Sequence, residues 1–160
     1  MKKYFKIGGY ILLAILLILQ FIRPSKNIHT GIQPNNITKL VPINDSLQQL
    51  FNVACMDCHS NNTRYPWYAN VMPLGWLINN HVVDGKRHFN FDEFTTYKAK
   101  RAIKKIGEIA ESVETDYMPM ENYTYIHKDA KLNAMQKTAI INWAKSAEAT
   151  LKVLYKDSTL

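Results

Sequence analysis

The stretch ACMDCHSNNTRYPWY, residues 54–68, decides how the fold of this chain is interpreted. It holds the two cysteines of the sequence, Cys55 and Cys58, and His59 directly follows the second one. Cysteines three residues apart direct both thiols toward one side of a helical turn. This spacing is typical of haem attachment, in which the thiols form thioethers and the histidine binds iron. We therefore predict covalent haem c on Cys55 and Cys58, with His59 as an axial ligand.

Three other roles for the cysteine pair stay open. A C-x-x-C pair also serves thiol–disulfide exchange, but such a pair usually follows a strand in a βαβ unit, and none is visible. Zinc would need a second close pair of ligands, whereas His29, His81, His88 and His127 are scattered along the chain. A structural disulfide suits an oxidising compartment, yet so short a loop constrains the unfolded chain little.

An iron bound by His59 needs either a sixth ligand or an open coordination site. Met118 and Met120 lie in the segment YMPME, where Pro119 disfavours a helix at Met118 and keeps it extended. A thioether on such a loop can reach over a haem edge, although methionines more often fill gaps in a core. We predict Met118 as the second axial ligand, with Met120 or His81 as alternatives.

Three further side chains are predicted haem contacts. Arg64 has a planar guanidinium group that suits a haem propionate, and a solvated surface position explains it equally well. Trp67 and Trp76 offer aromatic surface that can pack on a porphyrin, or on the protein core in any case. The sequence therefore adds Arg64, Trp67 and Trp76 to the cofactor-binding residues.

Residues 1–23 are predicted to be a membrane anchor or signal segment. Lys2, Lys3 and Lys6 precede an uncharged run over residues 7–22, which as a helix would be about 24 Å long. That length is short for a membrane span and long for a signal-peptide core, and no small-x-small cleavage pattern follows, so we favour an uncleaved anchor. The basic residues ahead of the run place the amino terminus in the cytoplasm. The domain then lies in the periplasm, on the far side of a bacterial plasma membrane where cytochromes c are assembled.

Residues 24–43 carry Pro24, Pro34 and Pro42 without sustained periodicity, which indicates an extended linker. The remaining residues, 44–155, are expected to form one domain, because a chain of 160 residues with 47% apolar side chains supports a single core. Four segments show apolar residues at helical spacing, and none shows strand-like alternation between hairpin turns. The predicted fold class is all-α: a small cytochrome c-like helical domain behind an N-terminal membrane helix.

The ends of the four predicted helices carry the usual signals. Asn44 or Asp45 caps a first helix that runs into the cysteines, and Pro73 starts a second helix that Gly85 ends. A third helix covers about residues 92–113. After the predicted loop YMPMENYTYIHKDAKL, Asn133 caps a last helix that ends near residue 154.

The distribution of charged residues and the motifs of the sequence narrow the classes of function to be expected. The cluster KAKRAIKKIGE, residues 98–108, has the spacing of a solvated helix face, and a nucleic-acid reader would show a more concentrated basic stripe. No acid–base pair, Ser-His-Asp set or phosphate loop is visible, so an electron carrier is predicted in preference to an enzyme. We expect single-electron transfer with a redox protein partner and no nucleic acid. The alternative is an open-site haem sensor or peroxidase-like protein, and less favoured is a thiol–disulfide protein.

Several segments in order resemble the small haem-binding domain proteins of bacterial envelopes, relatives of the class I cytochromes c. They are CMDCHSNNTRYPWY, the P-x-x-W of PLGW, HVVDGKRHFNFDEF, the MP of Met118 and Pro119, YTYIHKDAKL and the NW of the last helix, within about residues 45–145. The resemblance implies haem c on the two cysteines, His59 as proximal ligand and Met118 as distal ligand. Relatives tend to have an apolar residue or proline at the position of Met120, and HP-x-A in place of HKDA, so Met120 competes and His127 gains no role.

Overall fold

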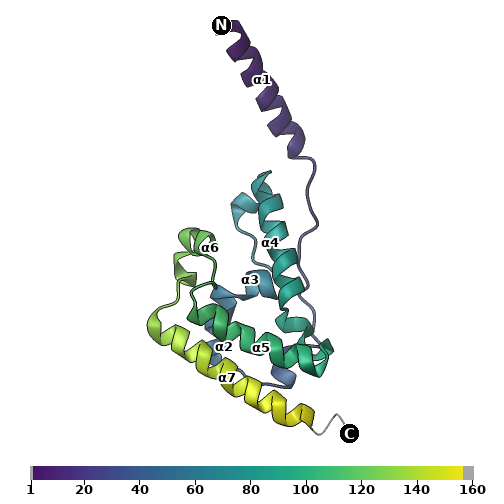
Figure 1. The fold of residues 1–160 in the computed structure, drawn as a ribbon. Coiled ribbons are helices and arrows are strands. Elements are labelled where there is room, and N and C mark those ends of the chain that lie inside the picture. Colours follow the sequence, from purple (N-terminus) through teal and green to yellow (C-terminus); the bar gives the residue numbers. More distant parts are fainter. Residues whose placement is uncertain (1, 157–160) are drawn as a thin grey trace.

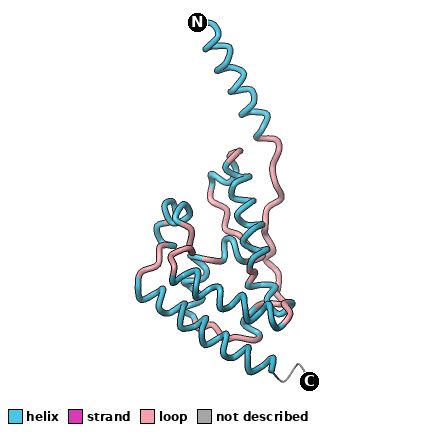
Figure 2. Tube along the Cα trace, viewed as in Figure 1, coloured by secondary structure: helices cyan, strands magenta, loops and turns pink. Residues whose placement is uncertain are grey.

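The computed structural model describes residues 2–156, and helices and loops alone make up that part of the chain (Figure 1, Figure 2). The all-α prediction is confirmed. The α-helices are α1 (Lys2–Leu19), α2 (Asp45–Ala54), α3 (Met56–His59), α4 (Leu74–His88), α5 (Ala99–Glu114), α6 (Glu121–Ile126) and α7 (Ala134–Lys156). Short 3-10 helices are η1 (Ile37–Lys39), η2 (Trp67–Asn70), η3 (Phe91–Thr96) and η4 (Lys128–Ala130). Figure 1 shows α1 projecting away from the other elements.

The core lies where α5 and α7 pack side by side. Buried residues recur three or four positions apart on both helices, so each helix presents one apolar face to the other. Phe51 of α2 closes this core, with its ring centroid 4.9 Å from Trp143 of α7 and 5.1 Å from Phe91. The core therefore fixes α2, and with it the start of the cysteine turn.

The helix N-termini predicted at Asn44 and Asn133 are confirmed. The side chain of Asn44 accepts a hydrogen bond from the Leu47 backbone N–H at 2.9 Å and caps α2. Asn133 accepts from Gln136 N–H at 2.9 Å, and the Gln136 side chain accepts from Asn133 N–H at 2.8 Å. This reciprocal pair is a capping box, and it starts α7.

Two helix boundaries differ from the prediction, and one short helix was not predicted. The helix α4 continues past Gly85 to His88, because Gly85 serves a close packing contact and not a chain reversal. Residues 91–96 form the 3-10 helix η3, whose N-cap is Asn90 and whose Phe91 and Phe94 are buried. The helix α5 therefore begins only at residue 99. The predicted loop before α7 contains the short helix α6.

Residues 24–43 are not a free linker. Much of the segment is extended, but Ile37 is fully buried and Val41 is 3% exposed within the core. The Asn35 and Asn36 amides donate to the carboxylates of Glu93 and Asp92 at 3.1 and 2.8 Å. Isolated apolar residues show no periodicity, so their burial left no signal in the sequence. The segment belongs to the folded domain.

No helix between residues 2 and 156 combines the length and the apolar character needed to cross a membrane. The predicted membrane helix is therefore not confirmed. The three lysines Lys2, Lys3 and Lys6 lie inside α1, and the helix ends at Leu19, before the end of the uncharged run.

Candidate haem site

A cavity of about 450 Å³ lies between the cysteine turn, α4, α5 and the loop that leads into α6. This volume is typical of a small-molecule or cofactor site. Its walls include the candidate ligands, namely Cys55, Cys58, His59, His81, Met118 and Met120, and apolar groups, among them Phe91, Ile109, Val113 and Ile140. The fold thus brings the cysteine motif and the two loop methionines to one cavity.

Both cysteines are free and partly buried. Cys55 is the N-cap of the short helix α3, and Cys58 lies within it. Burial raises the pKa of Cys55 to about 12, and the nearby Cys58 adds to the effect. Burial, followed by the charge of Asp57, raises the pKa of Cys58 to about 11. Thiol exchange proceeds through the thiolate, and a raised pKa lowers the fraction of that form. Among the described residues, no group of three or more His, Cys, Asp or Glu could hold a metal ion.

The orientation of His59 is set by α4. Its Nδ1 atom lies 2.9 Å from the carbonyl oxygen of Phe89, the C-cap residue of that helix. A carbonyl oxygen only accepts, so Nδ1 carries the proton and Nε2 keeps a free lone pair. Burial lowers the pKa of His59, which favours the neutral imidazole that binds metals. His59 therefore has the protonation and orientation of an iron ligand.

Gly85 lets α4 approach the cysteine turn. A Cβ atom at this position would lie 2.5 Å from the carbonyl oxygen of Cys58 and 3.0 Å from its Cβ. The two backbones are therefore in direct contact, and only glycine fits between them. Sequence analysis assigned Gly85 to a helix end, because a glycine that permits close packing and one that ends a helix look alike.

The three candidates for the sixth ligand all line the cavity, so the structure leaves the choice between them open. Met118 is held by its backbone N–H, which donates to Ser112 O at 2.9 Å, and Met120 is the N-cap of α6. Among the residues that the structure describes, Nε2 of His81 is the one buried side-chain nitrogen or oxygen without a hydrogen-bond partner. A buried imidazole nitrogen without a partner fits a cavity that receives a further group.

Comparison with known proteins agrees with this geometry. Residues 14–146 match the family model described as a haem-binding domain. This chain belongs to the haem-binding domain family. No curated protein and no solved structure shows a significant match. The predicted family is confirmed, and membership supports haem as the cofactor of the cavity.

The haem-binding domain does not place the other three predicted contacts in its cavity. Arg64 pairs with Asp57 through two guanidinium nitrogens, at 3.0 and 3.2 Å. Trp67 is 78% exposed, and Trp76 donates its indole N–H to Ile22 O at 2.8 Å. Arg64 thus has a carboxylate partner within its own chain, and neither tryptophan lines the cavity.

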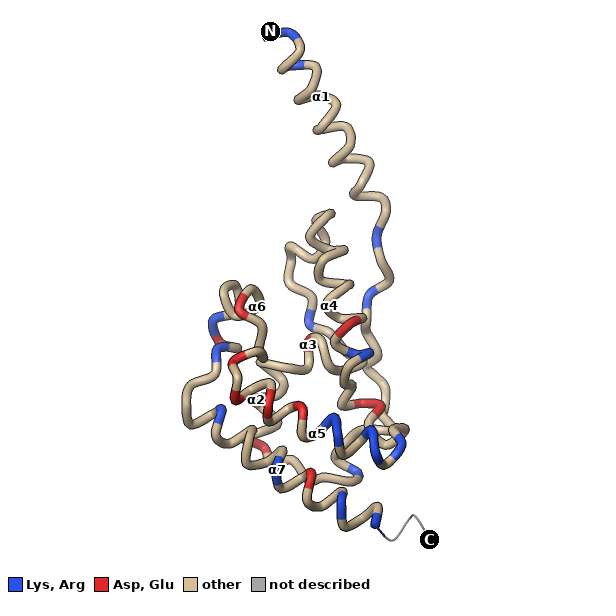
Figure 3. Tube along the Cα trace, viewed as in Figure 1, with Lys and Arg blue, Asp and Glu red and all other residues tan. Residues whose placement is uncertain are grey.

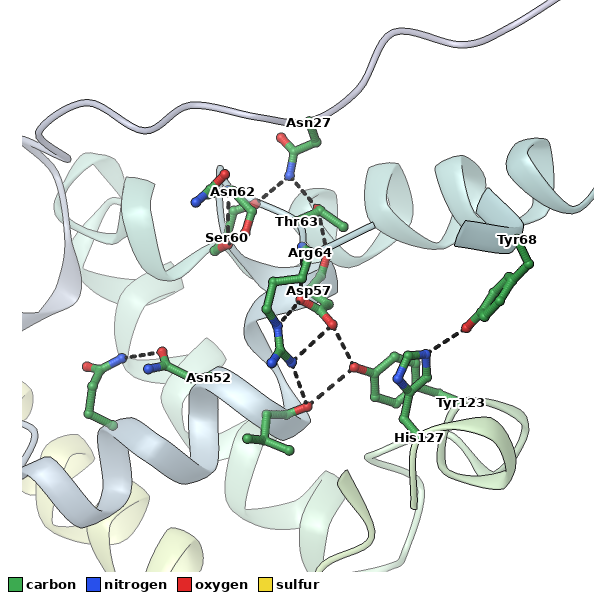
Figure 4. A network of polar contacts seen from close by, with 12 residues as sticks. Asn27, Asn52, Asp57, Ser60, Asn62, Thr63, Arg64, Tyr68, Tyr123 and His127 are labelled. Carbon is green, nitrogen blue, oxygen red and sulfur yellow. Dashed lines mark hydrogen bonds and ion pairs between the residues drawn. The ribbon is translucent and has the colours of Figure 1, made fainter. Parts of the chain in front are cut away.

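Asp57 lines the cavity and is a residue that the sequence analysis did not single out. It is 7% exposed and accepts hydrogen bonds from Arg64 and, at 2.8 Å, from the Tyr123 hydroxyl (Figure 4). His127 stacks on Tyr123 with ring centroids 4.4 Å apart, and its Nε2 is hydrogen-bonded to the Tyr68 hydroxyl at 2.7 Å. This network joins the cysteine turn to α6, and so to the loop that carries both methionines. Asp57 occupies a spacer position of the C-x-x-C-H motif, where sequence alone gives no reason to single it out.

Proposed function

We propose that this haem-binding domain is a monohaem c-type cytochrome that transfers single electrons. Cys55 and Cys58 would hold the haem as thioethers, and His59, through Nε2, and Met118 would be the protein's ligands to its iron. The observation that carries this proposal is the 2.9 Å contact between His59 Nδ1 and Phe89 O, beside two free cysteines that line the same cavity. Together these features supply an oriented neutral imidazole and an attachment point.

The residues present fit the cofactor. Haem supplies a one-electron redox centre, and the protein supplies attachment, ligands and a surrounding of low polarity. Ile109, Val113 and Ile140 give the cavity one apolar wall, and apolar surroundings of a haem tune its reduction potential. Met118 lies in a loop that is fixed at both ends. At one end the Met118 N–H donates to Ser112 O, and beyond the other end the Tyr123 hydroxyl donates to Asp57.

The test is expression of the full chain in a host that attaches haem c. We expect one haem to remain bound after denaturation, and a redox titration to follow a single reversible one-electron step. A variant with Cys55→Ser and Cys58→Ser should lose covalent haem. Retention of haem through denaturation in that double variant, or no haem in the wild-type chain, would contradict the proposal.

A second candidate function is an open-site haem sensor or peroxidase-like protein. The unpartnered Nε2 of His81 supports it, because such a protein needs a polar group near the sixth coordination position. Arg64, the polar side chain predicted to bind a haem propionate, is paired with Asp57 and does not line the cavity. A high-spin ferric spectrum, together with carbon monoxide binding to the reduced protein that displaces no ligand, would favour this function over electron transfer.

We further propose that the domain works on the outer side of a bacterial plasma membrane, attached through α1, with a redox protein as partner. One observation supports the attachment: α1 exposes apolar side chains along its length, such as Tyr10 at 72% and Leu12 at 59%. The side follows from the proposed cofactor, because cytochromes c are assembled outside the cytoplasm. Fractionation of cells that express the full chain tests it: the protein should be in the membrane fraction and accessible to protease from the periplasm.

A further inference from the structure

The arm formed by residues 65–83 is free of charge and exposes apolar side chains. Arg64 precedes it and Asp84 follows it, with no Asp, Glu, Lys or Arg between them. It comprises η2 and the first part of α4, here called the η2–α4 tip. Its exposed large apolar side chains are Trp67 at 78%, Val71 at 42%, Leu74 at 46%, Leu77 at 53% and Val83 at 55%. Leu74 and Leu77 are three residues apart and lie on one side of α4, and an exposed apolar surface without charge indicates an interaction site.

The η2–α4 tip is fastened to the foot of α1. The Gln20 side chain donates to Met72 O and accepts from Met72 N–H, both at 3.0 Å. Trp76 donates its indole N–H to Ile22 O at 2.8 Å. Figure 1 shows the tip and α1 at the same end of the molecule, and Figure 3 shows that end largely without charged residues. The tip therefore lies next to the C-terminal end of α1, whose apolar side chains are exposed.

Basic residues accompany this apolar surface. Residues 1–44 contain six Lys or Arg and no Asp or Glu, so they account for all but one unit of the net charge of +7. Two of these basic residues, Arg23 and Lys26, lie at the junction between α1 and the tip. They line a cavity of about 120 Å³ together with Tyr65, Asn70 and Asn79.

This combination suits an anionic lipid surface. Trp and aliphatic side chains enter the boundary between headgroups and acyl chains, while Lys and Arg beside them attract anionic headgroups. A protein partner would explain the apolar side chains, but it would give no reason for the exclusively basic segment that precedes them. The small cavity with Arg23 and Lys26 lies where the headgroup layer would meet the protein.

We propose that the η2–α4 tip binds an anionic lipid bilayer together with α1, with Arg23 and Lys26 at the level of the headgroup phosphates. The proposal rests on the membrane attachment through α1 proposed above and deepens it. Attachment at two places fixes the orientation of the domain on the membrane, whereas a single tether would leave the domain free to rotate.

Flotation of the full haem-loaded chain with vesicles tests this surface. The vesicles contain phosphatidylcholine alone or phosphatidylcholine mixed with phosphatidylglycerol, and haem absorbance measures the bound protein. The variant Leu74→Asp with Leu77→Asp should lower the partition coefficient about tenfold. The matched control is Met135→Asp with Val153→Asp on α7, where both side chains are at least as exposed, and it should change binding less than about twofold. Replacing Arg23 and Lys26 by Gln should reduce the preference for phosphatidylglycerol.

The outcomes separate this proposal from the earlier ones. If the tip variant binds as the wild type does, while Leu12→Asp with Leu16→Asp abolishes binding, the chain attaches through α1 alone and the tip proposal is wrong. If the wild type binds neither kind of vesicle, attachment through α1 is wrong as well. Equal binding to both kinds of vesicle would contradict the anionic lipid. The haem spectrum of every variant, recorded in solution, shows that it has folded and judges the haem proposal separately.

Discussion

The Nδ1 atom of His59 lies 2.9 Å from the carbonyl oxygen of Phe89, thirty residues further along the chain. Phe89 is 6% exposed, and its ring packs edge-on against Phe91 with centroids 4.7 Å apart. The acceptor of the histidine therefore belongs to the aromatic part of the core. The core fixes the imidazole, and the stability of the fold and the geometry of the site depend on the same residues.

The contact between α4 and the cysteine turn predicts a large effect of Gly85→Ala. The new methyl group would overlap the carbonyl oxygen of Cys58, and since backbone cannot move aside cheaply, we expect a loss of about 1–3 kcal/mol in the free energy of unfolding. The yield of covalent haem should fall with it. Denaturant titration and haem quantification measure the two effects.

The matched control is Gly107→Ala, also within a helix. Its nearest neighbours are side-chain atoms of Glu148 at 3.6–3.7 Å, which is ordinary contact. Alanine favours a helix over glycine by about 1 kcal/mol, so this variant should be neutral or stabilised. Equal effects of the two substitutions would show that the contact at Cys58 does not matter.

The buried carboxylate of Asp57 should contribute far more stability than an exposed one. Asp57→Ala removes the partner of both Arg64 and Tyr123, and we expect a loss of about 2 kcal/mol. Asp84→Ala, which removes an exposed pair with Arg87, should cost no more than about 0.5 kcal/mol. Thermal or denaturant unfolding of both variants gives the comparison, and a loss at Asp84 as large as at Asp57 would contradict it.

Alkaline pH should weaken the fold through Tyr123. Burial, followed by the charge of Asp57, raises the pKa of this tyrosine well above its ordinary value of 10.0. Because the pKa of Tyr123 is higher in the folded state, the protonated hydroxyl stabilises the fold fully below pH 10.0. This stabilisation is lost as the pH rises above that value. Tyr123→Phe should therefore show a shallower decline of unfolding free energy above this pH than the wild type. The exposed Tyr125→Phe is the control, and an unchanged slope for Tyr123→Phe would refute the assignment.

Burial of residues 24–43 predicts that this segment stabilises the domain. Ile37→Ala should cost about 2–5 kcal/mol, because Ile37 is fully buried in the core. Ile32→Ala in the same segment should have almost no effect, since Ile32 is 91% exposed. Equal stability of the two variants would mean that the segment is a linker after all.

Sequence reasoning predicted the features that depend on local patterns. The asparagine caps, the amphipathic faces of α2 and α7 and the helical turn at the cysteines follow from short-range spacing, and all of them are present. The proline in YMPME also kept Met118 out of a helix, and its loop reaches the cavity.

The features that were missed depend on contacts between distant residues. The pairing of Arg64 with Asp57 and of Tyr123 with Asp57 requires three parts of the chain to meet. The role of Gly85 in close packing depends on the backbone of Cys58. The burial of Ile37 depends on a core that later helices form. No local pattern carries this information.

Axial ligation of the haem iron by His59 and Met118 is the central claim, and the far-red absorption of the oxidised protein tests it most directly. A weak far-red band marks methionine sulfur on ferric iron. We predict that the wild type and Met120→Ala show this band and that Met118→Ala loses it. A band that persists in Met118→Ala and disappears in Met120→Ala would assign the ligand to Met120, and no band in the wild type would contradict methionine ligation.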